Sequence, residues 1–157
     1  MSFETGGEIA VDVDRASSFE FVRDARRLAT CIPGCRDLNE LSAGRYSAVL
    51  TSQVAFMILS FKAVIQVVKM DPPNAIEADI TCDAIGLPGH IVAKARMELT
   101  EAGEHHTAIR YVADVSLTGK LGGLGQPVFR ATSARLANEF GANLKKAVEA
   151  RRTETLA

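Results

Sequence analysis

The chain has 157 residues, of which 47% are hydrophobic, so it can bury a substantial core as one domain. Its formal charge of −1 provides no overall field for binding nucleic acid, and its longest apolar run, residues 54–59, is far below the about 20 residues of a membrane-spanning helix. The first residues lack the basic start and apolar run of a secretory signal. We therefore expect a cytoplasmic, single-domain protein over residues 1–157 that does not bind nucleic acid.

The N-terminal segment predicts a strand followed by helix. Residues 3–13 have the pattern of a strand, and residues 16–30 that of a helical segment with Phe19, Val22 and Leu28 on one face. A Pro-Gly pair at residues 33–34 ends this helical segment. We expect two short helices between the first and second strands.

Residues 36–118 alternate apolar and polar side chains in runs separated by turn residues, a pattern typical of an antiparallel meander. The alternation recurs in residues 61–67, 76–84, 91–99 and 109–117. In the clearest run, the apolar positions are Ile76, Ala78, Ile80, Cys82 and Ala84, and the polar positions between them are Glu77, Asp79, Thr81 and Asp83. The apolar face of such a sheet needs a cover.

A long C-terminal helix, expected from about residue 126 to residue 152, supplies this cover. Pro127 is compatible with its first turn. Its inward stripe, spaced by three or four residues and apolar except for one serine, consists of Phe129, Ser133, Leu136, Phe140, Leu144 and Val148. The predicted fold is α+β, with a curved antiparallel sheet of seven strands wrapped around this helix.

Three short strings identify a family by their order and spacing. They are the pentapeptide CIPGC at residues 31–35, Asp-Pro-Pro at residues 71–73, and the glycine-rich segment 121–127 before the last helix. Together they resemble the carbon monoxide dehydrogenase G-subunit family over roughly residues 1–150. That family belongs to the START-like, helix-grip superfamily, which also contains polyketide cyclases and lipid-transfer domains.

The resemblance implies an accessory role for a molybdenum-containing carbon monoxide dehydrogenase or a related hydroxylase. Such an accessory protein would help the enzyme associate with the inner face of the cell membrane and exchange electrons with quinone. The leading hypothesis is a non-enzymatic protein that binds an apolar, lipid-like or quinone-like molecule between the sheet and the long helix. The alternatives are a small enzyme of the cyclase or dehydratase type and a protein-interaction adaptor with a filled core.

Successive connections in a meander alternate between the two ends of the sheet, which sorts the turns by end. Residues 12–14, 42–44, 71–74 and 101–106 form a polar end, whereas residues 31–35, 54–59, 84–89 and 119–125 form an apolar or glycine-rich one. Contiguous apolar patches mark contact sites. We therefore expect membrane or partner contact at this apolar end through Pro33, Phe56, Met57, Ile58, Ile85, Leu87, Leu121 and Leu124.

The segment 56–58 departs from the resembling family, which usually has a short Gly-Pro turn at this point. The departure favours a stronger contact with a membrane or partner. In the alternative interpretation, Phe56, Met57 and Ile58 fold inward and plug the end of the sheet.

The inward positions of the strands and the long helix define the expected ligand site. Tyr46 and Tyr111 carry the main polar groups on this face, with Thr107 and Ser52 as lesser candidates. The two tyrosines either orient a ligand or are core residues with satisfied hydroxyl groups. The full set of expected lining residues is Ile32, Tyr46, Leu50, Phe61, Ile65, Ile80, Met97, Tyr111, Val115, Phe129 and Leu136.

The sequence offers no set of side chains suited to catalysis or to metal binding. The CxxxC spacing of Cys31 and Cys35 is not that of a zinc or thioredoxin site, and Cys82 lies in an apolar register. The three histidines fall in a polar turn or on the wet face of a strand. We expect no catalytic residue, no metal and no cofactor.

Overall fold

A computed structural model describes residues 2–119 and 126–156. In chain order the elements are β1 (Ser2–Val11), α1 (Arg15–Val22), α2 (Ala25–Ala29), β2 (Cys35–Ser42), β3 (Arg45–Val54), β4 (Met57–Asp71), β5 (Ala75–Ala84), β6 (Gly89–Glu101), β7 (Thr107–Gly119) and α3 (Gln126–Leu156). This order confirms the predicted one.

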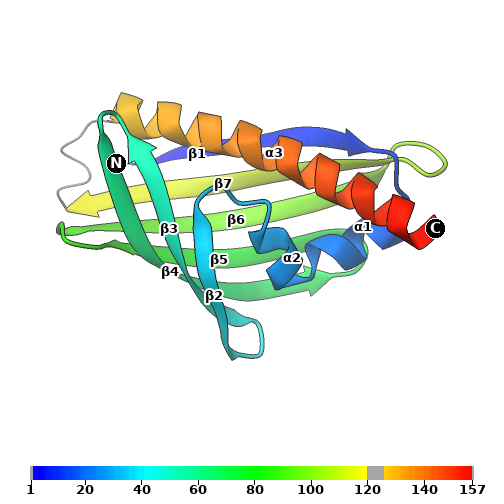
Figure 1. The fold of residues 1–157 in the computed structure, drawn as a ribbon, viewed down its shortest axis with the longest axis horizontal. Helices are drawn as coiled ribbons and strands as arrows, with labels where there is room; N and C mark the ends of the chain where they lie inside the picture. The colour runs from blue at the N-terminus through cyan, green and yellow to red at the C-terminus, as the bar shows by residue number, and fades with distance from the viewer. Residues whose placement is uncertain (1, 120–125, 157) are drawn as a thin grey trace.

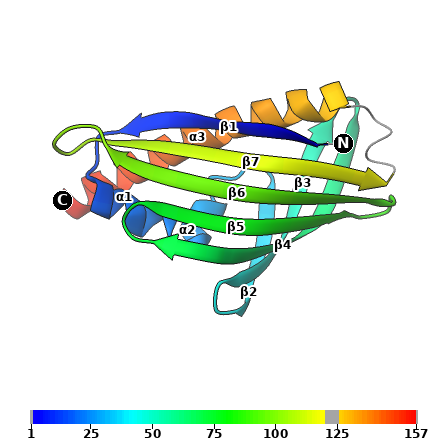
Figure 2. The same ribbon diagram turned by 180° about the vertical axis from the view of Figure 1, so that it is seen from behind.

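The seven strands form one antiparallel sheet in the order β1-β7-β6-β5-β4-β3-β2. The sheet is curved, and α3 lies along its concave side, with α1 and α2 near the C-terminal end of α3 (Figure 1). The view from behind shows the opposite face of the sheet, which no helix covers (Figure 2). The backbone of α3 approaches β1 and, at the other side, β3, so the helix bridges strands that lie far apart in the sheet.

The helical segment between β1 and β2 is broken because two aspartates each begin a helix. The Asp14 side chain accepts a hydrogen bond from the backbone N–H of Ser17, and this bond is the main cause of the lowered pKa of Asp14. The Asp24 side chain accepts from the N–H groups of Arg26 and Arg27. These N-caps explain why residues 16–30 form two short helices and not one continuous helix.

The interior contains two separate apolar clusters. The first lies beneath the C-terminal half of α3 and is built from Val11, Val13, Phe19, Phe21, Val22, Cys31, Met97, Leu99, Ile109, Leu144 and Val148. The second lies toward the N-terminal end of α3 and is built from Phe3, Val54, Phe61, Ala63, Cys82, Leu117 and Phe129. Both clusters join the concave face of the sheet to α3, as the inward stripe of the helix predicted.

Neither edge strand of the sheet is both regular and free of contacts with a helix. At the end of β1, Lys145 of α3 donates a hydrogen bond to the carbonyl of Ala10, and the N–H of Asp12 donates to Glu149. At the other edge, β2 pairs with β3 through two register shifts, and Asp37 of β2 has φ of 56°. Both edges are therefore either tied to a helix or irregular.

Candidate ligand-binding face

The strand register arranges the inward side chains in levels that run across the sheet. One level carries Tyr46 of β3, Ile65 of β4, Ile80 of β5, Ala93 of β6 and Val115 of β7. The parallel level nearer the polar end carries larger side chains again, and its members are Ile76, Met97 and Tyr111. Ile65, Ile80 and Val115 pack against the second cluster, whereas Met97 and Tyr111 belong to or pack against the first.

Between these two levels lies a row of three alanines at matched register. Ala78 pairs with Ala95, and Ala95 pairs with Ala113. All three are half-buried although they lie on the covered face, and they belong to neither apolar cluster. Small side chains fill less of the space above the sheet than the larger ones at the two neighbouring levels, and each alanine keeps part of its surface accessible to solvent. We call Ala78, Ala95 and Ala113 the alanine row.

Leu136 is the residue of α3 that lies between the two clusters along the helix. It follows Phe129, a member of the second cluster, by two turns and precedes Phe140, which packs on the first, by one turn. Leu136 is half-exposed and belongs to neither cluster. The alanine row and Leu136 thus lie between the two clusters, the alanine row on the sheet and Leu136 on the helix.

The expected lining residues fall into three groups. Phe61, Met97 and Phe129 are buried members of the two clusters, and Ile32 lies exposed on the loop before β2. The half-buried residues of the concave face are Tyr46, Leu50, Ile65, Ile80, Tyr111, Val115 and Leu136. The alanine row was not among the predicted lining residues. Its signal was available in the sequence, because the three alanines occupy the matching inward position of three successive strands.

Tyr111 joins the sheet to the long helix. Its hydroxyl donates a hydrogen bond to the carbonyl of Ala137 at 2.9 Å, and its ring meets that of Phe140 edge-on with centroids 5.1 Å apart. Burial raises the pKa of this phenol. The ring lies between two glycines, Gly7 of β1 and Gly141 of α3, where a Cβ atom at either position would collide with it. Tyr111 thus has the satisfied hydroxyl group of a core residue.

The other polar candidates differ in their partners. Thr107 is fully buried and donates to the carbonyl of Val13 at 2.7 Å, so it fixes the start of β7. The Oγ atom of Ser52 is buried and has no hydrogen-bond partner among the described residues. Tyr46 is half-buried at the level of Ile65, on the side of the alanine row that faces the apolar end.

The CIPGC segment joins α2 to β2 and packs against the middle of α3. Cys31 is buried in the first cluster, and its carbonyl accepts a hydrogen bond from the Asn143 side chain at 3.0 Å. The carbonyl of Gly34 accepts from the N–H of Thr51 at 3.0 Å, which begins the pairing of β2 with β3. The segment therefore contacts the core at Cys31, and does not simply join the apolar turns at the end of the sheet.

All three thiols are shielded, in different degrees. Desolvation raises the pKa of Cys82 to about 11, with a further contribution from the Asp83 carboxylate, and burial also raises the pKa values of Cys31 and Cys35. Cys31 and Cys82 are buried, whereas Cys35 is half-exposed. The structure gives Cys31 and Cys82 the environment of core residues.

We expect iodoacetamide at about pH 8 to alkylate Cys35 first in the folded protein. A raised pKa leaves a smaller fraction of the reactive thiolate, and burial blocks access, so Cys31 and Cys82 should react only on unfolding. Peptide mass spectrometry after timed alkylation measures the order. Modification of Cys82 as fast as Cys35 would contradict this assignment, and a urea-unfolded sample gives the reference rates.

The β3–β4 hairpin closes with a two-residue turn, Ala55–Phe56, in which Ala55 has φ of 55°. The side chain of Phe56 is 93% exposed and that of Ile58 is 76% exposed, whereas Met57 is half-buried. Phe56 and Ile58 therefore do not plug the interior. In the neighbouring β5–β6 turn, Ile85 is 52% exposed, and Leu87 packs against the second cluster. Pro33 is half-buried, and Leu121 and Leu124 lie outside the described residues.

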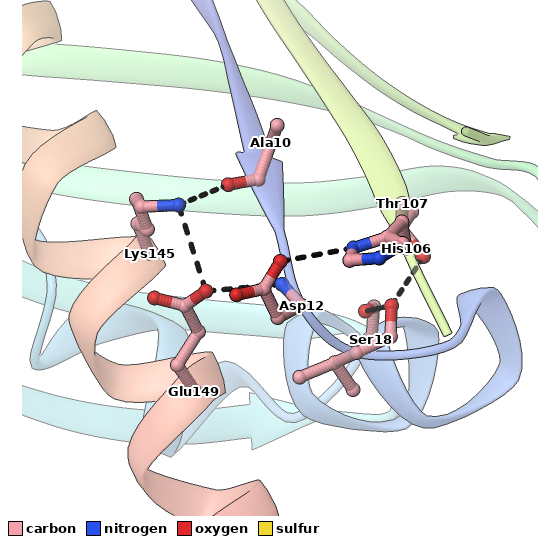
Figure 3. Close-up of polar contacts among 8 residues, drawn as sticks. Ala10, Asp12, Ser18, His106, Thr107, Lys145 and Glu149 are labelled. Atoms are coloured by element: carbon pink, nitrogen blue, oxygen red, sulfur yellow. Dashed lines mark hydrogen bonds and ion pairs between the residues drawn. The ribbon is translucent and has the colours of Figure 1, made fainter. Parts of the chain in front are cut away.

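The opposite end carries a chain of polar contacts that fastens α3 (Figure 3). Lys145 reaches the carbonyl of Ala10 and lies 3.5 Å from Glu149, and Glu149 accepts the N–H of Asp12 at 3.0 Å. The Asp12 carboxylate in turn lies 2.9 Å from Nδ1 of His106. These contacts hold the C-terminal half of α3 against the ends of β1 and β7.

The described residues include neither a metal-binding cluster nor a membrane-spanning helix. Over residues 2–119 and 126–156, no group of three or more His, Cys, Asp and Glu side chains is placed to hold a metal ion. In the same part of the chain, no helix combines the length and the apolar character needed to cross a membrane.

Solved structures resemble this chain over almost its full length. A conserved protein from Geobacillus kaustophilus superposes with a TM-score of 0.82 at 22% identity, covering 94% of this chain and 95% of that one. The Zhui aromatase/cyclase from Streptomyces sp. R1128 superposes with a TM-score of 0.61 at 15% identity, covering 100% and 96%. Ara h 8.0201 gives a TM-score of 0.56 at 16% identity, covering 98% of each chain. At these identities the likeness concerns the fold, which is the predicted helix-grip fold.

The family of the chain follows from its sequence, although no curated protein matches it significantly. The family model of the carbon monoxide dehydrogenase G subunit (CoxG) matches residues 7–149. These residues include the CIPGC segment, the whole meander and most of α3. The chain therefore belongs to the CoxG family, as its motifs predicted.

Proposed function

We propose that the protein binds an apolar, lipid-like or quinone-like molecule between the concave face of the sheet and α3, and that it does so without catalysing a reaction. The observation that carries the proposal is the alanine row. Three small, half-buried side chains lie at one level between two filled clusters, and Leu136 lies at the corresponding place on the helix. An apolar molecule bound at this level would bury its surface against the alanine row and Leu136, which belong to neither cluster.

The biological role we propose is that of an accessory protein in the cytoplasm, at the inner face of the cell membrane. Family membership supports a partnership with a carbon monoxide dehydrogenase or a related hydroxylase. The apolar residues exposed at the β3–β4 hairpin support contact with a membrane.

A second candidate is an enzyme of the cyclase type, which is favoured by the similar fold of the Zhui aromatase/cyclase. Such an enzyme would need an acid or base at the alanine row. On the concave face, the levels on either side of the alanine row carry the hydroxyl groups of Tyr46 and Tyr111, and the Tyr111 hydroxyl donates to the carbonyl of Ala137. This arrangement favours binding over catalysis. Turnover that disappears in a folded Tyr46→Phe variant would favour the enzyme instead.

The test places a large side chain on the sheet, at the middle position of the alanine row. We expect Ala95→Phe to lower the amount of apolar molecule recovered by organic extraction and mass spectrometry at least about tenfold, since a phenyl ring would occupy the space above the alanine row. If that space is open, the new ring gains a place to pack, and the melting temperature should stay the same or rise.

The matched control is Val92→Phe, which places the same ring on the outer face of the same strand, where Val92 is already exposed. It should leave the extracted molecule unchanged. Equal recovery from parent and Ala95→Phe protein would refute the assignment of the site. A loss of about 1–3 kcal/mol of stability in Ala95→Phe would show instead that the level is already packed.

A further inference from the structure

We propose that the tip of the β3–β4 hairpin, formed by Phe56 and Ile58, inserts into the headgroup region of an anionic lipid bilayer. The inference deepens the membrane role proposed above and rests on it, but it does not depend on which molecule the alanine row binds. It assigns the contact to a specific surface and specifies the charge of the lipid that this surface fits.

The first argument is the projection of the hairpin. β4 pairs with β5 only from Phe61 onward, whereas it pairs with β3 from Met57, so the first residues of β4 extend beyond the neighbouring strand. The carbonyl of Ser60 still accepts a hydrogen bond from the N–H of Ile85, so three residues of β4, 57–59, lie beyond β5. Three residues of strand amount to about 10 Å, so the tip extends past the point where β4 loses its contact with β5. Phe56 and Ile58 are exposed to water at this turn. Insertion into a bilayer would remove their apolar surface from water, which is favourable.

The second argument is charge. The described cationic side chains at this end include Lys62, on the same face of β4 as Ile58, and Arg130 and Arg135 on the first turns of α3. Arg36 of β2 lies at the register level of Lys62, and its charge is paired with that of Asp37 at 3.5 Å. Arg135 is held beside the hairpin because it donates to the carbonyl of Gln53 at 3.0 Å. Residues 49–64 contain no Asp or Glu, and the first acidic residue of α3 is Glu139. Exposed apolar side chains flanked by basic ones match anionic phospholipid headgroups.

An acidic side chain also lies at this end, on β5. The carboxylate of Asp83 on β5 lies 2.6 Å from Nδ1 of His90 on β6. Asp83 is also the register neighbour of Lys62, so it offsets part of the charge of that lysine. Arg130 and Arg135 lie on a different element, and the positive excess at the tip rests mainly on these two arginines.

A second exposed apolar patch offers an internal comparison. Leu41 and Val68, at the other end of β2 and β4, are 53% and 54% exposed, but the charges there are mixed, with Glu40 next to Leu41 and with Lys69 and Asp71 close to Val68. About 33 Å of strand separates Val68 from Ile58, at 3.3 Å per residue.

A single tryptophan would report insertion without background, because the chain contains none. We expect Phe56→Trp to show a blue-shifted emission, quenched by brominated acyl chains, when vesicles of phosphatidylcholine with phosphatidylglycerol are added. Vesicles of phosphatidylcholine alone should give a smaller shift, and added salt should reverse it. The control Val68→Trp, at the comparison patch, should show neither change.

Binding variants separate the apolar and electrostatic parts. Phe56→Ser with Ile58→Thr should weaken co-sedimentation with the anionic vesicles at least about tenfold, whereas Leu41→Ser should not. Lys62→Gln with Arg130→Gln should weaken it severalfold on anionic vesicles and leave binding to neutral vesicles unchanged. Each variant should yield as much extracted apolar molecule as the parent, which separates this test from that of the ligand site.

Three results would overturn the proposal. One is an unshifted Phe56→Trp emission in the presence of anionic vesicles, and another is an equal shift from Val68→Trp. The third is a shift that appears without lipid and grows with protein concentration, which would show that a second copy of the chain, or another protein, covers the tip.

Discussion

Replacing Gly34 by alanine should destabilise the protein by about 2–5 kcal/mol, and two separate costs contribute. Gly34 has φ of 76°, a left-handed conformation that costs a residue with a Cβ atom about 1–2 kcal/mol. A Cβ atom there would also overlap the carbonyl oxygen of Thr51, which is backbone and cannot rotate away. Relieving the overlap means moving Thr51, whose N–H donates to Gly34, at a cost of about 1–3 kcal/mol.

Gly86→Ala is the matched control for this substitution. Gly86 has φ of 80°, close to that of Gly34, but nothing lies within 4 Å of a Cβ atom placed on it. It should therefore lose only the conformational part, about 1–2 kcal/mol. Urea unfolding of both variants with comparable m-values measures the difference. Equal losses would show that the CIPGC loop adapts to the added methyl group, and that Gly34 is required only for its backbone conformation.

The second large effect concerns the contact between Gly141 and Tyr111. Alanine normally stabilises the interior of a helix by about 1 kcal/mol relative to glycine. At Gly141, however, the added methyl group would overlap the Tyr111 hydroxyl and lie 3.2 Å from the ring carbon that carries it, and also 3.2 Å from a methyl carbon of Ile9. The ring cannot easily retreat, because Gly7 lies close on its other side. We expect Gly141→Ala to destabilise the protein by about 2 kcal/mol in spite of its better helix propensity.

A double-mutant cycle tests the cause of that loss. Tyr111→Phe alone should cost about 1 kcal/mol, because it removes the hydrogen bond to the Ala137 carbonyl. It also removes the hydroxyl oxygen that a methyl group at position 141 would overlap, so Gly141→Ala should cost little stability in the Tyr111→Phe background. The expected coupling energy is about 1–3 kcal/mol, measured by thermal or urea unfolding of all four proteins. Additive effects would show that the clash is relieved by movement of the helix.

Much of the fold could be predicted because its elements are encoded locally. The period-two alternation of residues 76–84 and 91–99 fixes which side chains face inward, and their order along the chain fixes the meander. The stripe through Phe129, Leu144 and Val148 likewise identifies the face of α3 that is buried. Two short helices were expected before β2, but the sequence did not show where the first ends and the second begins, because Asp24 resembles an ordinary surface residue until its side chain is seen to cap the next turn.

The candidate site could be predicted only in outline, because it depends on register between strands. Large apolar residues such as Phe61 and Met97 attract attention in a sequence, yet they fill the two clusters. The level between the clusters carries alanines, and their shared position appears only when β5, β6 and β7 are aligned. The position of Cys31 against Asn143 of α3 joins residues 112 apart in the chain, which no local pattern reveals.

The treatment of the two sheet edges has a consequence for behaviour at high concentration. An exposed, regular edge strand offers unpaired backbone groups to the edge of another molecule, and so seeds aggregation. Here α3 engages the Ala10 carbonyl at the end of β1, and the register shifts of β2 interrupt the even spacing that a foreign strand would need. The protein can thus expose an apolar hairpin tip to water while the edges of its sheet offer few regular sites for pairing with a strand of another molecule.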